Sequence, residues 1–303
     1  MTKLIVSIPA FNEQKTIKKV IGSIPKQIKG IDQIEILVWD DGSTDNTAAA
    51  AKQAGADYIF SNKANLGLAK TFHNIIAKAI ELEADVLVNT DADNQYDQSQ
   101  ITELIAPIIN GDADLVNGNR QVAALTHMPA AKKYGNIIGS WVIRLLTGCE
   151  LMDASSGFRA YSKRCLGNFY LTSDHTYTHE TIIQAVNNDM VISEVPVAFS
   201  KREGESRLIS GVIDHIKKSA STIVRTILKY KAFKVFVSAG VVMMLIGGLG
   251  GVRFLYFFLQ GNGTGHIQSL ILSSILINLG FTTIAMGVLA DLISINRKMI
   301  RCK

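Results

Sequence analysis

The sequence predicts an α/β protein with a mostly parallel sheet and flanking helices, followed by a membrane-anchoring tail. Short apolar runs rich in Val, Ile and Leu alternate with segments of helical periodicity through the first two thirds of the chain. Several of these runs end abruptly in a polar, turn-forming motif, which is typical of strands in an open parallel sheet. Near the C-terminus, two apolar runs are each long enough to cross a bilayer.

The strands are predicted from short, β-branched apolar runs that polar residues terminate. Such runs are too short for buried helices, and polar turns separate them from the periodic segments. In chain order the predicted strands are Leu4–Ile8, Ile34–Trp39, Tyr58–Phe60, Val86–Val88, Asp114–Gly118 and Val191–Phe199.

Helices are predicted where apolar residues recur every three or four positions. In the first, Ile17, Val20, Ile21 and Ile24 share one face, and Pro25 ends it. Ser43 or Thr44 is expected to cap the alanine-rich helix that follows the second strand. A third helix is predicted to start at Asn65-Leu-Gly67, with Phe72, Ile75, Ile76 and Ile80 on one face. Two further helices are predicted at Ala130–Leu146 and from Thr178 through Ala185.

The C-terminal third predicts attachment to a membrane. Residues 211–231 have helical apolar spacing opposite basic side chains, which indicates an amphipathic helix at a membrane surface. Residues 232–259 and about 267–290 form a predicted two-helix transmembrane hairpin, so the expected domains are 1–210, 211–231 and 232–303. Basic residues flank both outer ends of the hairpin, and the positive-inside rule therefore places the α/β domain and both termini in the cytoplasm.

Composition limits the alternatives. The chain has 303 residues, 48% of them hydrophobic, and a formal net charge of +5. This charge is small for a nucleic-acid-binding protein, so no nucleic-acid partner is expected, but it favours an anionic membrane surface. Cys149, Cys165 and Cys302 have no disulfide or metal-ligand spacing, which is typical of a reducing compartment. Leu4–Ile8 is too short for the apolar core of a signal peptide.

The motif Asp91-Ala-Asp93 follows the strand Val86–Val88 and precedes a polar turn. At the carboxyl end of a strand, two carboxylates on a rigid support can hold a divalent cation, with substrate phosphates completing its shell. The alternative is a solvated turn that caps the helix near Ser99. No Gly-x-Gly-x-x-Gly follows the first strand, where Pro9-Ala-Phe-Asn-Glu13 stands instead, and this disfavours a nicotinamide enzyme.

Five motifs stand in order at the expected strand ends: Pro9-Ala-Phe-Asn-Glu13, Asp40-Asp-Gly-Ser-Thr-Asp45, Asn65-Leu-Gly67, Asp91-Ala-Asp93 and Ser156-Gly-Phe-Arg159. In this combination, residues 3–210 resemble the family 2 glycosyltransferases, which have the Rossmann-like GT-A fold. The resemblance is greatest to polyprenyl-phosphate glycosyltransferases, such as dolichol-phosphate mannose synthase and bacterial undecaprenyl-phosphate glucosyltransferases. Several of these proteins also end in a two-helix tail.

The resemblance implies a site for a nucleotide-sugar donor and a Mg²⁺ or Mn²⁺ ion. The residues implied to line the nucleotide pocket are Pro9, Ala10, Glu13 and Asp41, with Asp40 on the base or ribose. Those implied to surround the metal, which bridges the donor diphosphate, are Asp91, Asp93 and Gln95. Arg202 and Arg207 lie in the loop that closes over the nucleotide in relatives.

On the acceptor side, the resemblance implies a polyprenyl phosphate, undecaprenyl or dolichyl, which needs cationic side chains. Arg120 stands where relatives carry a phosphate-binding arginine, and Lys132 and Lys133 are expected to assist it. Asp153 faces the reaction centre in relatives, and is expected either to orient the acceptor or sugar or to take a proton from the phosphate. His179 and Glu180 are as readily explained by the start of a helix.

The implied reaction is inverting transfer of a hexose from a donor of the UDP-glucose or GDP-mannose type. The sequence does not choose the sugar, and amino-sugar and deoxy-sugar donors stay open. A lipid phosphate already carries about 1.5 or more negative charges near pH 7, so its oxygen can attack the anomeric carbon directly. Two membrane helices could also pack within a homo-oligomer.

The sequence fits three other functions less well. A processive polysaccharide synthase usually carries Gln-x-x-Arg-Trp before its spans, but Trp39 and Trp141 are the two tryptophans and neither follows an arginine. A non-catalytic scaffold of a glycosylation complex would be expected to have degenerate carboxylates, whereas Asp91 and Asp93 are intact. A flippase or transporter would need polar residues within its spans and usually more than two helices.

Overall fold

The computed structural model describes residues 1–126, 128–171, 177–201 and 232–301. The chain divides into two compact units, Met1–Ile223 and Val224–Lys303. The predicted amphipathic helix at 211–231 lies outside the described residues, and the domain boundaries at 210 and 231 stay predictions.

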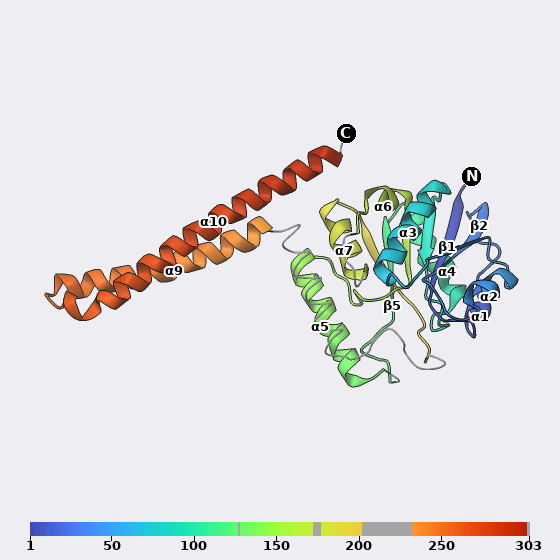
Figure 1. The fold of residues 1–303 in the computed structure, drawn as a ribbon, viewed down its shortest axis with the longest axis horizontal. Coiled ribbons are helices and arrows are strands. Elements are labelled where there is room, and N and C mark those ends of the chain that lie inside the picture. Colours follow the sequence, from blue (N-terminus) through green and yellow to red (C-terminus); the bar gives the residue numbers. More distant parts are fainter. Residues whose placement is uncertain (127, 172–176, 202–231, 302–303) are drawn as a thin grey trace. The chain divides into compact units, whose positions relative to one another are not determined.

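The first unit is built on a seven-stranded sheet of order β3-β2-β1-β4-β6-β5-β7 (Figure 1). Its strands are β1 (Lys3–Ala10), β2 (Gln33–Asp40), β3 (Tyr58–Ser61), β4 (Val86–Asn89), β5 (Leu115–Asn119), β6 (Arg159–Ser162) and β7 (Ile192–Pro196). Strand β6 runs antiparallel to β4 and β5, and the other neighbouring pairs are parallel. The predicted mostly parallel sheet is confirmed.

Helices cover both faces of this sheet, because the side chains of a central strand alternate between the faces. On one face, Leu4 and Val6 of β1 share a core with α1 (Ile17–Ser23) and α4 (Ile101–Ile109). On the other face, Ile5 shares a core with α3 (Leu68–Glu81). The remaining helices of this unit are α2 (Thr47–Gln53), the short η1 (Gln98–Gln100), α5 (Ala130–Thr147), α6 (Lys163–Asn168) and α7 (Thr178–Asn187).

Some local predictions need correction. Neither Ser43 nor Thr44 caps α2; the carboxylate of Asp45 accepts the Thr47 N–H at 3.0 Å. The predicted strand 191–199 shortens to β7, and beyond it Phe199 makes an isolated bridge with Tyr96. Strand β6 was not predicted, because its sequence, Arg159-Ala-Tyr-Ser162, begins and ends with polar residues and contains no β-branched apolar run.

The order of the strands creates a switch point between β1 and β4. The chain leaves β1 for β2 and β3 on one side, and returns to the other side of β1 as β4. Loops that leave neighbouring strands in opposite directions open a crevice at the carboxyl ends of those strands. Asn12 and Asn94 lie in these two loops, and each has a positive φ, 56° and 60°. Asparagine tolerates this conformation better than most residues, so both loops have the sharp bends typical of functional sites.

The second unit is a helical hairpin. It consists of α9 (Ala232–Leu259) and α10 (Ile267–Arg301), joined by the short η2 (Gly263–His266). A β-carbon at Gly240 would lie 2.6 Å from the carbonyl oxygen of Gly280, so glycine permits the close approach of the helices. Helix α10 extends well past the end predicted near residue 290.

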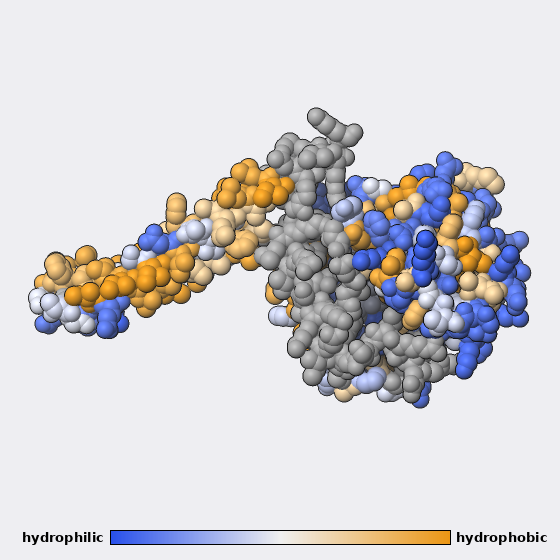
Figure 2. All heavy atoms as spheres, viewed as in Figure 1, coloured by the Kyte–Doolittle hydropathy of each residue, from blue (hydrophilic) through white to orange (hydrophobic). Residues whose placement is uncertain are grey.

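The surface of this hairpin fits a lipid environment. Among the described residues, these two helices are long and apolar enough to cross a membrane, with spans at Ala232–Leu259 and Thr264–Ile293. Only 11% and 17% of their apolar windows are buried, whereas a core helix of a soluble protein would be mostly buried. Figure 2 shows apolar side chains along most of the hairpin.

A glycine in the turn after β2 yields the first prediction. Gly42 has φ +75°, and a β-carbon there would lie 2.5 Å from the backbone carbon of Ala64, whereas Gly55 has φ +94° and open space around it. Both Gly42→Ala and Gly55→Ala should cost about 1–2 kcal/mol for the left-handed backbone. Gly42→Ala should lose more, because the neighbouring backbone must move. Thermal unfolding in detergent, followed by circular dichroism, measures the difference; equal losses would contradict the close approach.

Candidate active site

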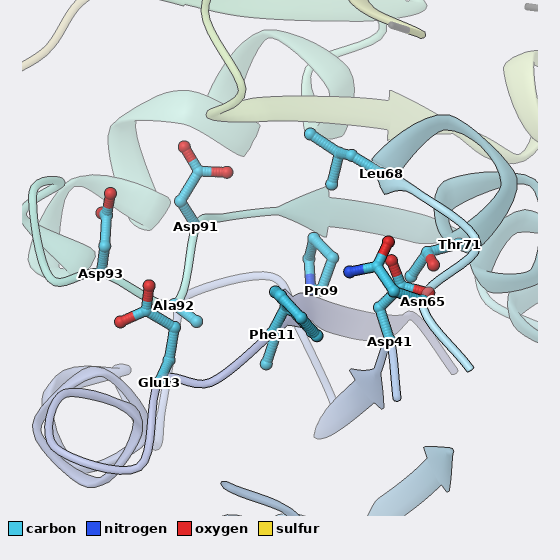
Figure 3. A pocket seen from close by; sticks show the side chains of 11 residues that line it. Pro9, Phe11, Glu13, Asp41, Asn65, Leu68, Thr71, Asp91, Ala92 and Asp93 are labelled. Atoms are coloured by element: carbon cyan, nitrogen blue, oxygen red, sulfur yellow. The ribbon is translucent and has the colours of Figure 1, made fainter. Parts of the chain in front are cut away.

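A cleft opens at the switch point, beyond the carboxyl ends of β1 and β4. The residues that line it are Pro9, Ala10, Phe11, Glu13, Asp41, Asn65, Leu68, Thr71, Asp91, Ala92 and Asp93. Figure 3 shows that the carboxylates of Glu13, Asp91 and Asp93 gather at one end. Asp41 and Asn65 lie at the other end, with aromatic and apolar side chains between the two ends. The cleft therefore has an acidic end and a hydrogen-bonding end.

Short contacts hold the acidic end in place. The hydroxyl of Thr16 donates to Glu13 Oε2 at 2.9 Å, and the Gln95 N–H donates to Asp93 Oδ1 at 3.2 Å. Asp91 packs against Gly157, where a β-carbon would lie 3.0 Å from Asp91 Oδ1. The absence of a side chain at Gly157 thus leaves room for the Asp91 carboxylate.

This donor set suits Mg²⁺ or Mn²⁺, since both prefer carboxylate oxygens. Within the described parts of the chain, however, no three Asp, Glu, His or Cys side chains form a complete metal cluster. A cation held by Asp91 and Asp93 would therefore need further oxygen ligands from a bound substrate. A diphosphate group can supply such oxygens, so the donor set fits a cation that binds together with a diphosphate.

Asp41 builds the opposite wall of the cleft. Its carboxylate accepts the N–H groups of Leu66 and Gly67, both at 2.9 Å, and the side-chain amide of Asn62 at 2.7 Å. These bonds fold the loop between β3 and α3 against the turn after β2, so Asn65 and Leu68 face the cleft. Leu68, Thr71, Phe11 and Ala92 had no predicted role; the pattern of the sequence shows no signal for Thr71, which lies within α3.

Two residues implied for the donor site, Asp40 and Gln95, do not line the cleft. Asp40 is buried, and its carboxylate accepts the Ser43 N–H at 3.0 Å, so it supports the turn and does not line the cleft. The side-chain amide of Gln95 donates to the carbonyl of Ser200 at 2.9 Å, which ties the Asp93 turn to the segment after β7. Arg202 and Arg207 lie outside the described residues.

Arg120 and Asp153 form a buried, bidentate ion pair. Arg120 Nε donates to Asp153 Oδ2 at 2.7 Å, and Nη2 donates to Oδ1 at 2.8 Å. Nη2 also donates to the hydroxyl of Ser155 at 3.0 Å. The guanidinium lies over the ring of Phe199, 5.2 Å from its centre. The two residues predicted for the acceptor side are thus brought together, and each fixes the orientation of the other.

The pair also determines the protonation of Asp153. Burial opposes ionisation of the carboxylate, but the hydrogen bonds and positive charge of Arg120 outweigh it and lower the pKa of Asp153 below its usual value of 3.8. A carboxylate with a lowered pKa is a weak base near neutral pH. Of the two roles expected for Asp153, orientation is therefore favoured over proton acceptance.

Several unpredicted residues support this pair. Glu194, on β7, accepts the backbone N–H of Asp153 at 3.1 Å and the side-chain amide of Asn117 at 2.9 Å. On α5, the hydroxyl of Ser140 accepts the Ala154 N–H at 3.0 Å. A charged residue within the apolar run 191–199 was the signal that could have identified Glu194.

A buried arginine anchors the turn between the two halves of the site. Arg159 is fully buried, and its guanidinium donates to Asn117 Oδ1 at 2.8 Å and to the carbonyl of Ala154 at 2.8 Å. Strand pairing sets Arg159 opposite Asn89, just before the Asp91 motif. The turn 153–158 therefore connects these two halves, because it carries Asp153 at its start and Gly157, which packs against Asp91, near its end.

The other predicted cations lie in the first turn of α5. Lys133 Nζ donates to the carbonyl of Leu125 at 3.2 Å, so this side chain holds the loop that precedes the helix. Lys132 is half-buried in the same turn. His179 and Glu180 are buried at the start of α7.

A seven-stranded sheet of this order, with an acid-lined cleft at its switch point, defines the class as a GT-A-like α/β domain. Residues 5–168 match the glycosyl transferase family 2 domain, and the chain belongs to this family. It is thus a glycosyltransferase by family.

Curated relatives agree with this assignment, and a solved structure shares the fold. The chain is 32% identical to a UDP-N-acetylglucosamine–dolichyl-phosphate N-acetylglucosaminyltransferase of Methanococcus voltae, over 63% of this chain and 82% of that protein. It is 28% identical to a dolichyl-phosphate hexose transferase of Haloferax volcanii, over 68% and 86%. A glucosyl-3-phosphoglycerate synthase from Mycobacterium tuberculosis, solved with Mn²⁺ and UDP, shares the fold with a TM-score of 0.55 and 22% identity, over 75% and 79%.

The lowered pKa of Asp153 yields a prediction about pH. A depressed folded-state pKa means that the stabilising effect of the carboxylate is complete above about pH 4 and is lost only on further acidification. Asp153→Asn should reduce transfer about ten- to a hundredfold, because it removes a charge-assisted contact. The defect should be constant from about pH 5.5 to 8.5, a range that brackets a phosphate's second pKa.

Initial rates of sugar transfer across this range, for the variant and the unsubstituted protein, measure the profile. Thermal unfolding of both proteins shows whether the variant stays folded under the assay conditions. A defect that shrinks above the second pKa of the phosphate would instead assign proton acceptance to Asp153.

Proposed function

We propose that this protein transfers a hexose from a nucleotide sugar of the UDP-glucose or GDP-mannose type to a polyprenyl phosphate. The observation that carries the proposal is that one turn connects the acid-lined cleft to the buried Arg120–Asp153 pair: Asp153 begins this turn, and Gly157 packs against Asp91. One side has the ligands for a nucleotide diphosphate and its cation, and the other has a fixed positive group for a phosphate. The names of relatives that act on dolichyl phosphate support the same acceptor class.

The donor occupies the cleft in this proposal. Its nucleoside lies toward Asp41 and Asn65, and its diphosphate lies toward Asp91 and Asp93. Asp91 and Asp93 hold the Mg²⁺ or Mn²⁺ ion, with Gln95 in the same turn. When bound, the cation neutralises the negative charge that develops on the leaving nucleoside diphosphate.

The acceptor phosphate approaches from the side of Arg120. The ion pair with Asp153 holds the guanidinium in one orientation, so that it can bind the phosphate without reorganising. A phosphate oxygen then forms a bond to the anomeric carbon as the bond to the diphosphate oxygen breaks, which inverts the configuration. No side chain has to deprotonate the attacking oxygen, which agrees with the lowered pKa of Asp153.

A second hollow lies next to this pair, between the loop after β5 and α5. Asn119, Gln121, Asn136 and Arg144 contribute its polar groups, and Val122, Ala123, Ala124 and Ile137 are among its apolar ones. Asn136 also accepts a hydrogen bond from Ser155 at 2.9 Å, which connects the hollow to the ion pair. A mixed lining of this kind suits the phosphate end of an amphipathic acceptor.

The decisive assay uses the purified full-length protein with undecaprenyl or dolichyl phosphate and Mn²⁺. UDP-glucose, GDP-mannose and UDP-N-acetylglucosamine are tested in turn, with released nucleotide and lipid-linked sugar as the products. One donor should be transferred with inverted configuration, established by NMR of the product. Retained configuration would reject direct attack, and the absence of transfer from every nucleotide sugar would reject the function.

Metal dependence is tested at the acidic end of the cleft. Asp93→Asn should abolish nearly all transfer and weaken Mn²⁺ binding in the presence of UDP, measured by electron paramagnetic resonance, because a hard ligand is lost. Asp97→Asn is the matched control in the same turn. Asp97 caps η1 by accepting the Ser99 N–H at 3.0 Å, a role that asparagine can take, so this variant should stay active. Full activity of Asp93→Asn, or of the protein in EDTA, would contradict the metal assignment.

We also propose that the hairpin crosses the membrane with the catalytic unit and both termini in the cytoplasm, because basic residues flank its outer ends. A cysteine introduced as Asn262→Cys, in the exposed connection between the spans, should react with an impermeant maleimide in intact cells. The unsubstituted protein is the control, and its own cysteines should react only after lysis. Labelling of Asn262→Cys only after lysis would reverse the orientation.

A further inference from the structure

Helix α5 carries an apolar stripe on the outside of the catalytic unit. Tyr134, Ile138, Trp141 and Leu145 recur every three or four residues, so they share one face of the helix, and each is more than half exposed. Figure 1 shows α5 as a long helix at the margin of this unit. Large exposed apolar patches on soluble surfaces usually mark a binding surface.

The opposite face of α5 supports the acceptor side of the candidate active site. Ile143 is fully buried, Ser140 accepts the Ala154 N–H, and Asn136 accepts a hydrogen bond from Ser155. Ser155 in turn accepts a hydrogen bond from Arg120. One helix therefore joins the exposed stripe to the turn that holds the Arg120–Asp153 pair.

We propose that the outer face of α5 docks on the lipid bilayer, with its stripe in the interfacial region. This inference deepens the proposed function, since it assigns the surface through which a membrane-borne acceptor meets the site. The chemistry of the helix favours lipid as the occupant. Tyr134 and Trp141 are aromatic residues of the kind enriched at membrane interfaces. The helix contains Lys132, Lys133 and Arg144 and no acidic residue, so its charge complements anionic lipid headgroups.

The chain itself supplies the membrane. Helices α9 and α10 are candidate spans in the same polypeptide, so the catalytic unit is tethered to any bilayer that they cross. Apolar side chains on a tethered unit have a lipid surface available at high effective concentration. Interfacial helices of this type combine an apolar face with basic flanks, and α5 has both.

Intrinsic fluorescence tests the inference directly. The whole chain contains two tryptophans, Trp39 and Trp141, and neither lies in a candidate span. Trp39 stacks on Phe60 and donates to Asn62, toward the β3 edge of the sheet. In nanodiscs of brominated phosphatidylcholine and phosphatidylglycerol, the emission of the full-length protein should be quenched relative to unbrominated lipid. In Trp141→Phe the remaining emission should be the same in both lipids.

A charge on the stripe provides the functional arm of the test. Leu145→Glu should reduce the quenching of Trp141 and raise the KM for polyprenyl phosphate embedded in vesicles at least severalfold. Donor binding, and transfer to a short-chain acceptor dispersed in detergent, should be unchanged. Ile80→Glu is the matched control, since Ile80 is a half-exposed isoleucine on α3, and it should alter neither readout.

Other outcomes would overturn the inference. Equal Trp141 emission in brominated and unbrominated lipid would show that the stripe does not contact the bilayer. If Leu145→Cys then formed a disulfide-linked dimer, the stripe would be an interface between two copies of the chain. The proposed function is tested separately: unquenched Trp141 in an active enzyme refutes the docking surface alone. Quenched Trp141 without transfer to any polyprenyl phosphate refutes the function alone and supports the docking surface.

Discussion

The parallel pairing of β1 with β2 on one side and β4 on the other is the constraint on which the candidate active site depends. The register sets Ala10 opposite Asp40 and Ser7 opposite Asn89, so three loops begin at the same edge of the sheet. Because the chain leaves β1 toward β2 and returns beyond it as β4, the loops diverge and a cleft lies between them. The carboxylates of Glu13 and Asp91 meet there although they are far apart in sequence.

The antiparallel strand β6 adds the second half of the site. It lies between β4 and β5, and Arg159 at its start stands opposite both Asn89 and Asn117. A buried cation is costly unless hydrogen bonds satisfy it, and Arg159 donates to acceptors from the 153–158 turn, β5 and α7. This network fixes the turn that carries Asp153 and Gly157. The Arg120–Asp153 pair is thus positioned by packing within the core.

The two halves have different electrostatics. The acidic end of the cleft repels a diphosphate unless a cation is present, whereas the charge of Arg120 is balanced by Asp153, which also fixes the orientation of the guanidinium. In the function that we propose, the donor diphosphate binds at the acidic end of the cleft and the acceptor phosphate binds on the side of Arg120. The inner face of α5 braces the same turn, so the surface that we assign to the bilayer is mechanically connected to the acceptor side.

The family resemblance implied Glu13 and Asp41 as residues of the cleft. The local sequence determined the class of fold, the strands β1 to β5, the apolar hairpin and the Asp91-Ala-Asp93 motif. These features are local, because the alternation of residues in a strand, the residue types of a turn and the length of an apolar run all depend on residues that are close in sequence. Tertiary structure decided which side chains meet. In the folded chain, Asp40 supports a turn and does not line the cleft, and Arg120 pairs with Asp153. Glu194 and Arg159, from distant elements, form hydrogen bonds with the turn that contains Asp153. Such contacts depend on strand order and on the short antiparallel β6, and sequence spacing encodes neither.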